Sequence, residues 1–469
     1  MNPINIVLLR PTDVLFFRDG RPMEGSLAGH GAAWPLPSVT DAAFHAALHR
    51  SGLNGHAHDQ RRDAERHGKD NRQFGSLVTA GPFPVRVGNP PTSGASSGAL
   101  SEVHWFFPRP LDLQAATLTP SLLPTAPFDS ALSSLPNPLK YPVASTLPPN
   151  KENQAKAWLH ADAFQRYLDG GTAHIMDGEA LDDSAFSDQE ATVGIAIEAE
   201  TGTTGHGDAA GKIYSARYLR LRDGWRLGVF AKTDEKNETA ARQDLIPDLI
   251  NEQGQLLVGG QQRLCTAQLC TEATIPLPHG KTDGFSEHDR KWLVKWVLLS
   301  PAIWPELPAR AKDGRPMAPH CGGWLPNWVR QTDGQVMLRS GERQLRTYLG
   351  KHSRGYGVDS KEIDARLVAA LVPKPIPVTG WALANKVDRL ESGAKSTHLA
   401  VPAGAVYYFQ AGSENDAQNL AAALNWHGRE KSEIRNQKSE ITMNRRSTLM
   451  GEKGFGLGVC GTWRFHGQE

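Results

Sequence analysis

A chain of 469 residues is too long for one ordinary core, and usual domain sizes predict two domains. Its formal net charge of +1 excludes the strongly basic balance of many free nucleic-acid binders, so any nucleic-acid site must be local or shared with partner subunits. No apolar run approaches the roughly 18 residues that span a membrane, and the start has no basic signal region, so we expect a soluble, cytoplasmic protein without a membrane partner.

The four cysteines include no CxxC pair, which argues against a disulfide framework and against a zinc ribbon. Cys265 and Cys270 lie in a strand-like run and are expected to be small buried residues. The 46 glycines and 32 prolines predict many turns and long irregular connections.

The N-terminal segment reads as strand, loop and helix. Ile4 to Leu9 is a continuous apolar run typical of a central strand, and a turn over residues 18–22 follows a second short apolar run. Ser38 is the expected N-cap of a helix whose small residues can pack closely on a sheet. Ala155 to Tyr167 is a further helix candidate, and the charged segment 54–72 reads as an inserted loop.

A long β-hairpin is predicted in the middle of the chain. Thr192 to Ile197 and Ile213 to Leu221 are strand-like and flank a Gly- and Thr-rich tip, so the hairpin spans about 192–221. Further strands are expected at Arg226 to Phe230 and Leu256 to Val258.

A second series of elements starts after residue 285, where we place the boundary between domains 1–285 and 286–469. Its expected strands and helix are Trp292 to Leu299, Ala405 to Phe409, Asp416 to Leu424 (helix) and Leu457 to Trp463. Both series follow a β-α-β-β-α-β-like order, blurred by large loop insertions. The sequence therefore predicts an α+β protein of two ferredoxin-like domains.

Glycines beside cations form the candidate binding motifs. Lys453-Gly454-Phe455-Gly456-Leu457-Gly458 carries glycines at alternate positions, which would leave one face open for a polyanion to reach backbone N–H groups. A tight turn before the last strand is the alternative. The dinucleotide fingerprint does not fit, because no helix follows.

Two further segments repeat this combination. Arg18 and Arg21 flank Gly20 next to two phenylalanines, and arginine forks suit phosphates and stack on bases, although a salt bridge to Asp19 is the alternative. Gly259-Gly260-Gln261-Gln262-Arg263 has the same glycine and arginine character. The helix end at Ser38 is an anion site in principle, although most such ends bind only water.

Catalytic and metal-binding motifs do not emerge. The sequence has no HExxH, no serine nucleophile elbow and no GxxxxGK[ST]. His56, His58 and His67 lie in the charged loop and read as solvated side chains rather than metal ligands. His30, between two glycines, is the best candidate for a general base in RNA cleavage.

Six blocks in order carry a family resemblance. These are LLRPTDVLFFRDGRPM, WPLPSVTDAAFHAALHR, VGIAIEAETG with GKIYSARYLRL, LLVGGQQRL, PVTGWALANK and KGFGLGVCGTW. Together they resemble the RAMP-superfamily subunit that caps the guide-RNA 5′ end in type III-B CRISPR (Cmr) effector complexes, and the resemblance covers most of the chain apart from the insertions.

The resemblance implies two ferredoxin-like, RRM-related domains and a non-catalytic subunit without cofactor or metal that grips the repeat-derived 5′ tag of crRNA. The implied partners are the large polymerase/cyclase-like subunit, the repeating backbone RAMP subunit and, indirectly, target RNA. The hairpin becomes a thumb-like element beside the first guide nucleotides. The implied RNA-binding residues are Arg18, Gly20, Arg21, Ser38, Gly259, Gly260, Gln261, Arg263, Lys453, Gly454, Phe455, Gly456 and Gly458.

The chain departs from the family pattern at Asp41 and in two apparent insertions, segments 54–72 and 427–446. Asp41 stands where such helices tend to carry a small residue, which puts close approach of RNA to the first helical turn in doubt. Segment 427–446 is an apparent insertion rich in Arg and Lys, either a solvated loop or a contact to RNA or a neighbour.

Two alternative functions remain open at this point. One is a RAMP endoribonuclease that processes precursor crRNA, with His30 as its base. The other is a scaffold that contacts only proteins.

Overall fold

The computed structural model describes residues 4–18, 20, 28–29, 32–53, 76–88, 103–114, 116–125, 134–148, 155–195, 197–198, 200–203, 213–233, 235–236, 242–270, 275–309, 318–340, 361–382, 393–428 and 443–467. Arg21, His30, the predicted insertion at 54–72 and residues 429–442 of the second predicted insertion lie outside these residues.

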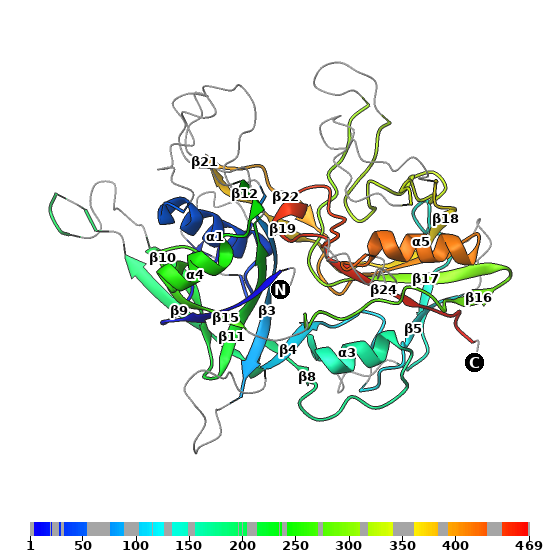
Figure 1. The fold of residues 1–469 in the computed structure, drawn as a ribbon, viewed down its shortest axis with the longest axis horizontal. Helices are drawn as coiled ribbons and strands as arrows, with labels where there is room; N and C mark the ends of the chain where they lie inside the picture. The colour runs from blue at the N-terminus through cyan, green and yellow to red at the C-terminus, as the bar shows by residue number, and fades with distance from the viewer. Residues whose placement is uncertain are drawn as a thin grey trace.

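The first half of the chain builds a large sheet whose strands run in the order β14-β15-β1-β11-β3-β4-β7-β8 (Figure 1). Its neighbouring strands pair antiparallel. The strands are β1 (Asn5–Pro11), β3 (Val78–Val87), β4 (Val103–Pro108), β7 (Trp158–His160), β8 (Ala180–Leu181), β11 (Trp225–Lys232), β14 (Gln255–Leu257) and β15 (Leu264–Cys270).

Helices α1 (Pro37–Ser51) and α4 (Ile246–Gln253) cover one face of this sheet. Successive residues of a strand point to opposite faces, and in β1 Val7 packs under the helices while Leu8 packs into the core on the other face. Both faces of β1 are therefore buried, which explains its continuous apolar run and confirms the predicted central strand.

The second half builds a smaller sheet in the order β16-β17-β23-β18, with β24 also paired to β17 (Figure 1). Helix α5 (Glu414–Leu424) packs its small and aliphatic residues on this sheet. It begins where the Ser413 hydroxyl accepts a hydrogen bond from the Asp416 N–H, which is an N-cap. The strands are β16 (Ser286–His288), β17 (Lys291–Leu298), β18 (Ala365–Leu371), β23 (Val406–Ala411) and β24 (Gly458–Thr462).

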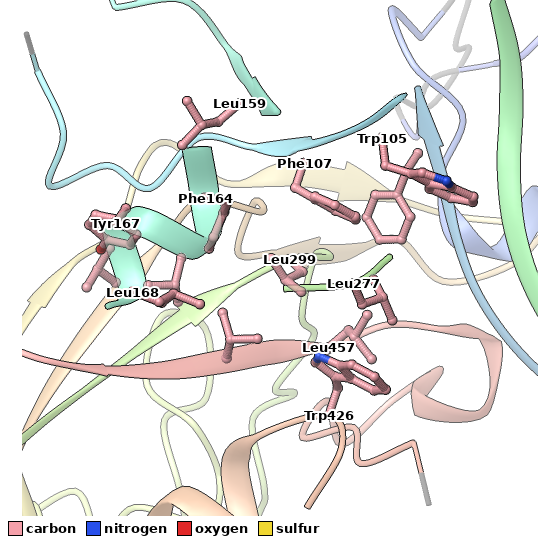
Figure 2. Packing of buried hydrophobic residues seen from close by; sticks show 14 of the residues in the cluster. Trp105, Phe107, Leu159, Phe164, Tyr167, Leu168, Leu277, Leu299, Trp426 and Leu457 are labelled. Carbon is pink, nitrogen blue, oxygen red and sulfur yellow. The ribbon is translucent and has the colours of Figure 1, made fainter. Parts of the chain in front are cut away.

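A single apolar cluster joins the two sheets. Figure 2 shows Trp105 and Phe107 of β4 together with Phe164 of α3 (Ala161–Leu168) and with Trp426 and Leu457 from the C-terminal part of the chain. Since residues from both sheets contribute to this cluster, burial of apolar area holds the two halves against each other.

A buried ion pair lies at the edge of this cluster. The Lys295 ammonium on β17 donates to Asp112 at 2.8 Å, and the Tyr167 hydroxyl donates to the same carboxylate. Burial lowers the pKa of Lys295, and Asp112 opposes that change. Removal of either charge would leave the other buried and unpaired, so the pair fixes how the segment around Asp112 sits on the second sheet.

The predicted hairpin is present and projects from one side of the molecule (Figure 1). It consists of β9 (Ser187–Ile195) and β10 (Ile213–Leu221), and β10 also pairs in parallel with β2 (Ala28–Gly29). The remaining short elements are β5 (Leu122–Pro124), β6 (Val143–Ser145), β12 (Glu235–Lys236), β13 (Arg242–Gln243), β19 (Ile376–Val378), β20 (Trp381–Ala382), β21 (Gly393–Ala394), β22 (His398–Ala400) and the 3-10 helices η2 (Asp183–Ala185) and η4 (Gly451–Lys453).

Two local predictions were wrong. Helix α1 has Leu36 as its N-cap and Pro37 in its first turn, because proline already fits the helical φ and needs no N–H there, so Ser38 lies inside the helix. The helix predicted from Ala155 begins only at Ala161, since strand β7 comes first and the His160 side chain caps the helix by accepting from the Asp162 N–H.

The structure is thus a mixed α and β protein with mostly antiparallel sheets. Among the helices in the described ranges, none is long and apolar enough to cross a membrane.

Candidate RNA interface

The turn at Phe16–Gly20 is the centre of the candidate interface. Gly20 is buried, and a Cβ at this position would overlap the carbonyl of Pro377 and approach the Val378 nitrogen to 2.7 Å. Glycine is therefore required here because strand β19, from the second half of the chain, crosses directly over the turn. Arg18 is exposed beside this crossing.

Residues 259–263, here the open turn, pack against the same Phe16–Gly20 segment. The Gly260 N–H donates to the Phe16 carbonyl at 2.9 Å, and a Cβ on Gly259 would lie 2.8 Å from the Phe17 ring. Phe16 and Phe17 therefore occupy the space that a side chain at either glycine would need. Gln261 is exposed, with its backbone in the left-handed region at φ 57°.

Tyr218 of β10 contacts two side chains of the open turn, Gln261 and Arg263. Its hydroxyl donates to Gln261 Oε1 at 3.0 Å, and its ring lies 5.5 Å from the Phe16 ring. The Arg263 guanidinium lies over the Tyr218 ring at 5.2 Å and donates to the same Gln261 oxygen at 3.3 Å. An aromatic pair, a guanidinium and an amide thus form one surface at the root of the hairpin.

Sequence reasoning missed Tyr218, although a signal existed. The strand IYSARYLRL places Tyr218 directly after Arg217 and two residues before Arg220, so Tyr218 and Arg220 share one face of the strand. Such a pattern suits base stacking beside phosphate contacts.

The charges around this surface are balanced. Arg220 is paired with Glu190 on β9 and donates to Asp13 at 2.9 Å, and Asp13 also lies 3.8 Å from Arg263. Two guanidinium groups therefore face two carboxylates, so Arg220 and Arg263 are balanced in charge.

Residues 451–458, here the closed loop, behave differently from the prediction. A Cβ on Gly454 would lie 2.9 Å from the Thr79 carbonyl, while one on Gly456 would overlap the Ser447 nitrogen and one on Gly458 the Trp296 ring. Phe455 is fully buried beside Val378. The predicted open glycine face is wrong, because protein atoms fill the space above each glycine.

Several backbone N–H groups of the closed loop also have protein partners. Gly456 donates to the Pro301 carbonyl at 2.7 Å, Gly454 to Gly451 at 3.1 Å and Phe455 to Met450 at 3.3 Å. These donors satisfy protein carbonyls, whereas the Lys453 side chain is 33% exposed and can reach a ligand.

Lys453 lies beside a buried carboxyl group. Its ammonium is 3.6 Å from Asp41, which also accepts a hydrogen bond from the Thr79 hydroxyl at 3.3 Å. Burial raises the pKa of Asp41 to about 6, while Lys453 lowers it and Glu452 raises it. The sequence predicted that Asp41 hinders close approach of RNA to the first turn of the helix. In the structure, the carboxylate of Asp41 competes with any phosphate for the Lys453 ammonium.

The structure brings most of the predicted segments together. Leu36, at the start of α1, packs with Val378 and Phe455, which links the half-buried Ser38 to the closed loop. Through Gly20 and Phe16 the same cluster continues to the open turn. Whether RNA binds these residues stays a prediction.

The arginines at the end of segment 427–446 are not a solvated patch. Arg445 donates to the Gly451 carbonyl and Arg446 to the Ala423 carbonyl, each at 2.6 Å, and both side chains are buried. Indole N–H groups of Trp304 and Trp328 in turn donate to the Arg446 carbonyl. Desolvation lowers the pKa of Arg445 to about 10. The solvated-loop interpretation is therefore wrong for Met443 to Arg446.

The cysteines differ in burial. Cys265 is buried as predicted, whereas Cys270 is only half-buried, and Cys321 is exposed. In the ranges that the structure covers, no three His, Cys, Asp or Glu side chains are placed to hold a metal ion.

Fold and interface together define a class: a mixed α and β protein on two mostly antiparallel sheets, with a projecting hairpin and an aromatic and cationic surface at its root. Residues 7–463 match the family described as CRISPR-associated protein (Cas_Cmr3). The chain belongs to this family and is thus a RAMP-type Cmr subunit.

Solved CRISPR structures resemble the chain at low identity. A chain of a cryo-EM structure of the Type III-B Cmr-beta bound to cognate target RNA is 13% identical, with 86% of each chain covered and a TM-score of 0.32. A chain of a crystal structure of the Csm3-Csm4 subcomplex in the type III-A CRISPR-Cas interference complex is 9% identical over 86% of this chain and 92% of that one, with a TM-score of 0.35. None of the curated proteins compared with the chain matches it.

Proposed function

We propose that this Cmr3-family chain is a non-catalytic subunit that holds the 5′ repeat-derived tag of crRNA in a type III-B CRISPR interference complex. In the same complex it joins the large polymerase/cyclase-like subunit to the repeating backbone subunit and meets target RNA only indirectly. Family membership supports the complex, and the exposed surface described above supports the RNA contact.

The strand order supports a ferredoxin-like, RRM-related interpretation of both halves. Four strands run in the order β15-β1-β11-β3 in the first sheet and β24-β17-β23-β18 in the second. Numbered along the chain, each set has the order 4-1-3-2, the order of a β-α-β-β-α-β unit. Helices α1, α4 and α5 lie at the positions in the chain order where such units have helices.

The observation that carries the proposal is the convergence at the Phe16–Gly20 turn. Arg18 is exposed there, and the Tyr218–Arg263 stack adjoins it through Phe16. Guanidinium groups and aromatic rings are the side chains on which unpaired RNA bases stack and which hold phosphates. The hairpin, with Val193, Ile195 and Ile197 exposed at 72%, 55% and 65%, is the proposed thumb-like element beside the first guide nucleotides.

Salt-dependent binding of synthetic crRNA, with and without its 5′ tag, to the assembled complex tests this function. The variant Arg18→Ala/Lys453→Ala is expected to flatten the dependence of log affinity on log salt by roughly one unit per lost phosphate contact. Arg263→Ala is expected to reduce the preference for tagged RNA with little change in slope, because Arg263 already faces a carboxylate.

A matched control is Arg330→Ala, which removes an exposed arginine that pairs with Asp333 in the second half of the chain. It should leave slope and tag preference unchanged. Equal affinity for tagged and untagged RNA in the wild-type complex would contradict the proposed specificity. Precursor crRNA cleavage by the wild-type chain that His30→Ala abolishes would instead favour the endoribonuclease, and absence of any RNA crosslink to Arg18, Lys453 or Arg263 would favour a pure scaffold.

A further inference from the structure

Gln261 and Gln262, in the open turn, both adopt the left-handed backbone conformation, with φ of 57° and 53°. This conformation costs roughly 1–2 kcal/mol for a residue with a Cβ, and glycine would adopt it freely. The chain already uses glycine at the two preceding positions. Strain that persists in this way is a reason to look for a role of the side chains.

The contacts of Gln261 define which way its amide faces. Arg263 has only donors, so the group that it contacts at 3.3 Å must be the carbonyl oxygen Oε1 rather than the amide nitrogen. Tyr218 donates to the same oxygen at 3.0 Å. Both acceptor sites of Oε1 are therefore in use, and the amide nitrogen Nε2 points its two N–H donors away from them.

The exposed end of Gln261 consequently presents donors alone. Across the part of the chain that the structure describes, no protein acceptor is hydrogen-bonded to Nε2. An ordinary glutamine reads adenine with its oxygen and nitrogen together, accepting from N6 and donating to N7. With its oxygen occupied, Gln261 cannot make that pair, whereas two donors match the O6 and N7 acceptors of guanine.

Charge at this place favours a base edge over a phosphate. Arg263 and Arg220 are balanced by Asp13 and Glu190, and a phosphate placed beside Asp13 would meet a like charge. The Arg263 guanidinium, which lies over Tyr218 and is 30% exposed, offers a plane on which a neutral base can stack.

We propose that Gln261 is a specificity-determining residue that donates from its amide nitrogen to guanine in the bound RNA and thereby discriminates against adenine at one position. Arg263 and Tyr218 position the amide, and the left-handed backbone of the open turn projects it. This inference rests on the proposed function, because it needs RNA at the hairpin root.

The test measures affinities of the assembled complex for synthetic crRNAs in which each tag nucleotide is changed in turn to guanosine, adenosine or inosine. Inosine keeps the O6 and N7 acceptors and lacks the exocyclic amine. At one position the wild-type complex is expected to prefer guanosine over adenosine by about tenfold, the value of one net hydrogen bond, and to bind inosine like guanosine.

Gln261→Gly removes the amide and suits the left-handed backbone, so it should preserve folding and reduce the preference to within about twofold. Gln262→Gly is the matched control, since it relieves the same strain one residue further on, and it should keep the full preference. If Gln261→Gly fails to assemble, Gln261→Met keeps the length of the side chain and removes its donors.

The outcomes separate this inference from the proposed function. Two outcomes overturn the role of Gln261 alone while binding still depends on the tag. In one, Gln261→Gly keeps the guanosine preference; in the other, the wild type has no such preference at any position. Wild-type binding that ignores the tag altogether overturns both.

Discussion

The closed loop and the open turn look alike in the sequence and differ in the folded protein. Both combine glycines with one cation, and both were predicted to bind RNA, with backbone donors to a polyanion expected for the closed loop. In the closed loop the glycines are covered by Thr79, Ser447 and Trp296, whereas the open turn packs its glycines on two phenylalanines and exposes Gln261 and keeps Arg263 partly exposed.

The difference shows that a glycine indicates that other atoms lie close to the backbone. It does not indicate whether those atoms belong to a ligand or to the protein itself. A missing Cβ makes room equally for a ligand, for a neighbouring strand or for an indole ring. The chain position of the glycines does not distinguish these cases, because the atoms that fill the space come from residues far away in the sequence.

The largest expected effect is on the free energy of unfolding, which a glycine-to-alanine substitution should lower much more in the closed loop than in the open turn. Gly456→Ala should destabilise the protein by roughly 3 kcal/mol or more, because Gly456 has φ 78° and its Cβ would overlap a backbone nitrogen that cannot turn away. Gly260→Ala should cost about 1 kcal/mol, since its φ is not in the left-handed region and its Cβ would meet the Phe16 side chain at 2.9 Å and backbone only at an ordinary 3.6 Å. Denaturant midpoints measure both.

Gly467→Ala controls for the backbone conformation itself. Gly467 has nearly the same φ, 80°, and nothing within 4 Å of the added Cβ. If Gly456→Ala lowers the free energy of unfolding no more than Gly467→Ala does, the closed loop is less tightly packed than described.

A smaller effect depends on pH and concerns Asp41 beside the closed loop. Its pKa in the folded protein, about 6, lies above the ordinary 3.8, so the native state holds this proton more tightly than the unfolded state does. The stability that Asp41 contributes is therefore fully present below about pH 4 and is lost as the pH rises through 6, by at most about 3 kcal/mol.

Asp41→Asn should remove this pH dependence. In thermal denaturation, the stability of the variant relative to the wild type should therefore increase from pH 4 to pH 7.5. Lys453→Met should strengthen the dependence, because Lys453 lowers the pKa of Asp41. Parallel stability profiles of wild type and Asp41→Asn would contradict the burial of an ionisable carboxyl group at this position.

In the open turn, Tyr218→Phe should have a modest effect. The variant keeps the ring under Arg263 and loses the hydrogen bond to Gln261, at a cost of about 0.5–1 kcal/mol in stability. Tyr141→Phe, which removes a 3.4 Å contact to Gln410 elsewhere, serves as a control. Only Tyr218→Phe should weaken discrimination between guanosine and adenosine in the complex.

The smallest effect on stability is expected in the hairpin. Ile195→Thr replaces a side chain that is 55% exposed and should change the free energy of unfolding by no more than about 0.5 kcal/mol. The same variant should reduce self-association of the isolated protein in light scattering, because exposed aliphatic residues on strand β9 promote contact between copies. Val229→Thr, at a fully buried position, should instead be clearly destabilising.

Much of the fold was predictable because local patterns suffice for it. Strand β1, helix α5 and the hairpin were predicted from apolar runs and from two strands around a Gly-rich tip, although α5 begins at Glu414 rather than Asp416 and β9 at Ser187 rather than Thr192. Ser38 failed as an N-cap because Pro37 is the first helical residue, which moves the N-cap two residues back to Leu36, and the sequence does not decide between these two start signals.

The sequence by itself determined the elements, the family and the segments that carry glycine and arginine, because these depend on periodicity, on backbone freedom and on the order of short blocks. Only the tertiary structure decided which glycines have protein atoms packed against them. It also decided that Arg263 lies over the Tyr218 ring and that the Gln261 side-chain oxygen accepts hydrogen bonds from the protein. Each of these depends on contacts between residues far apart in the chain, and such contacts exist only after the sheets and the hairpin have packed together.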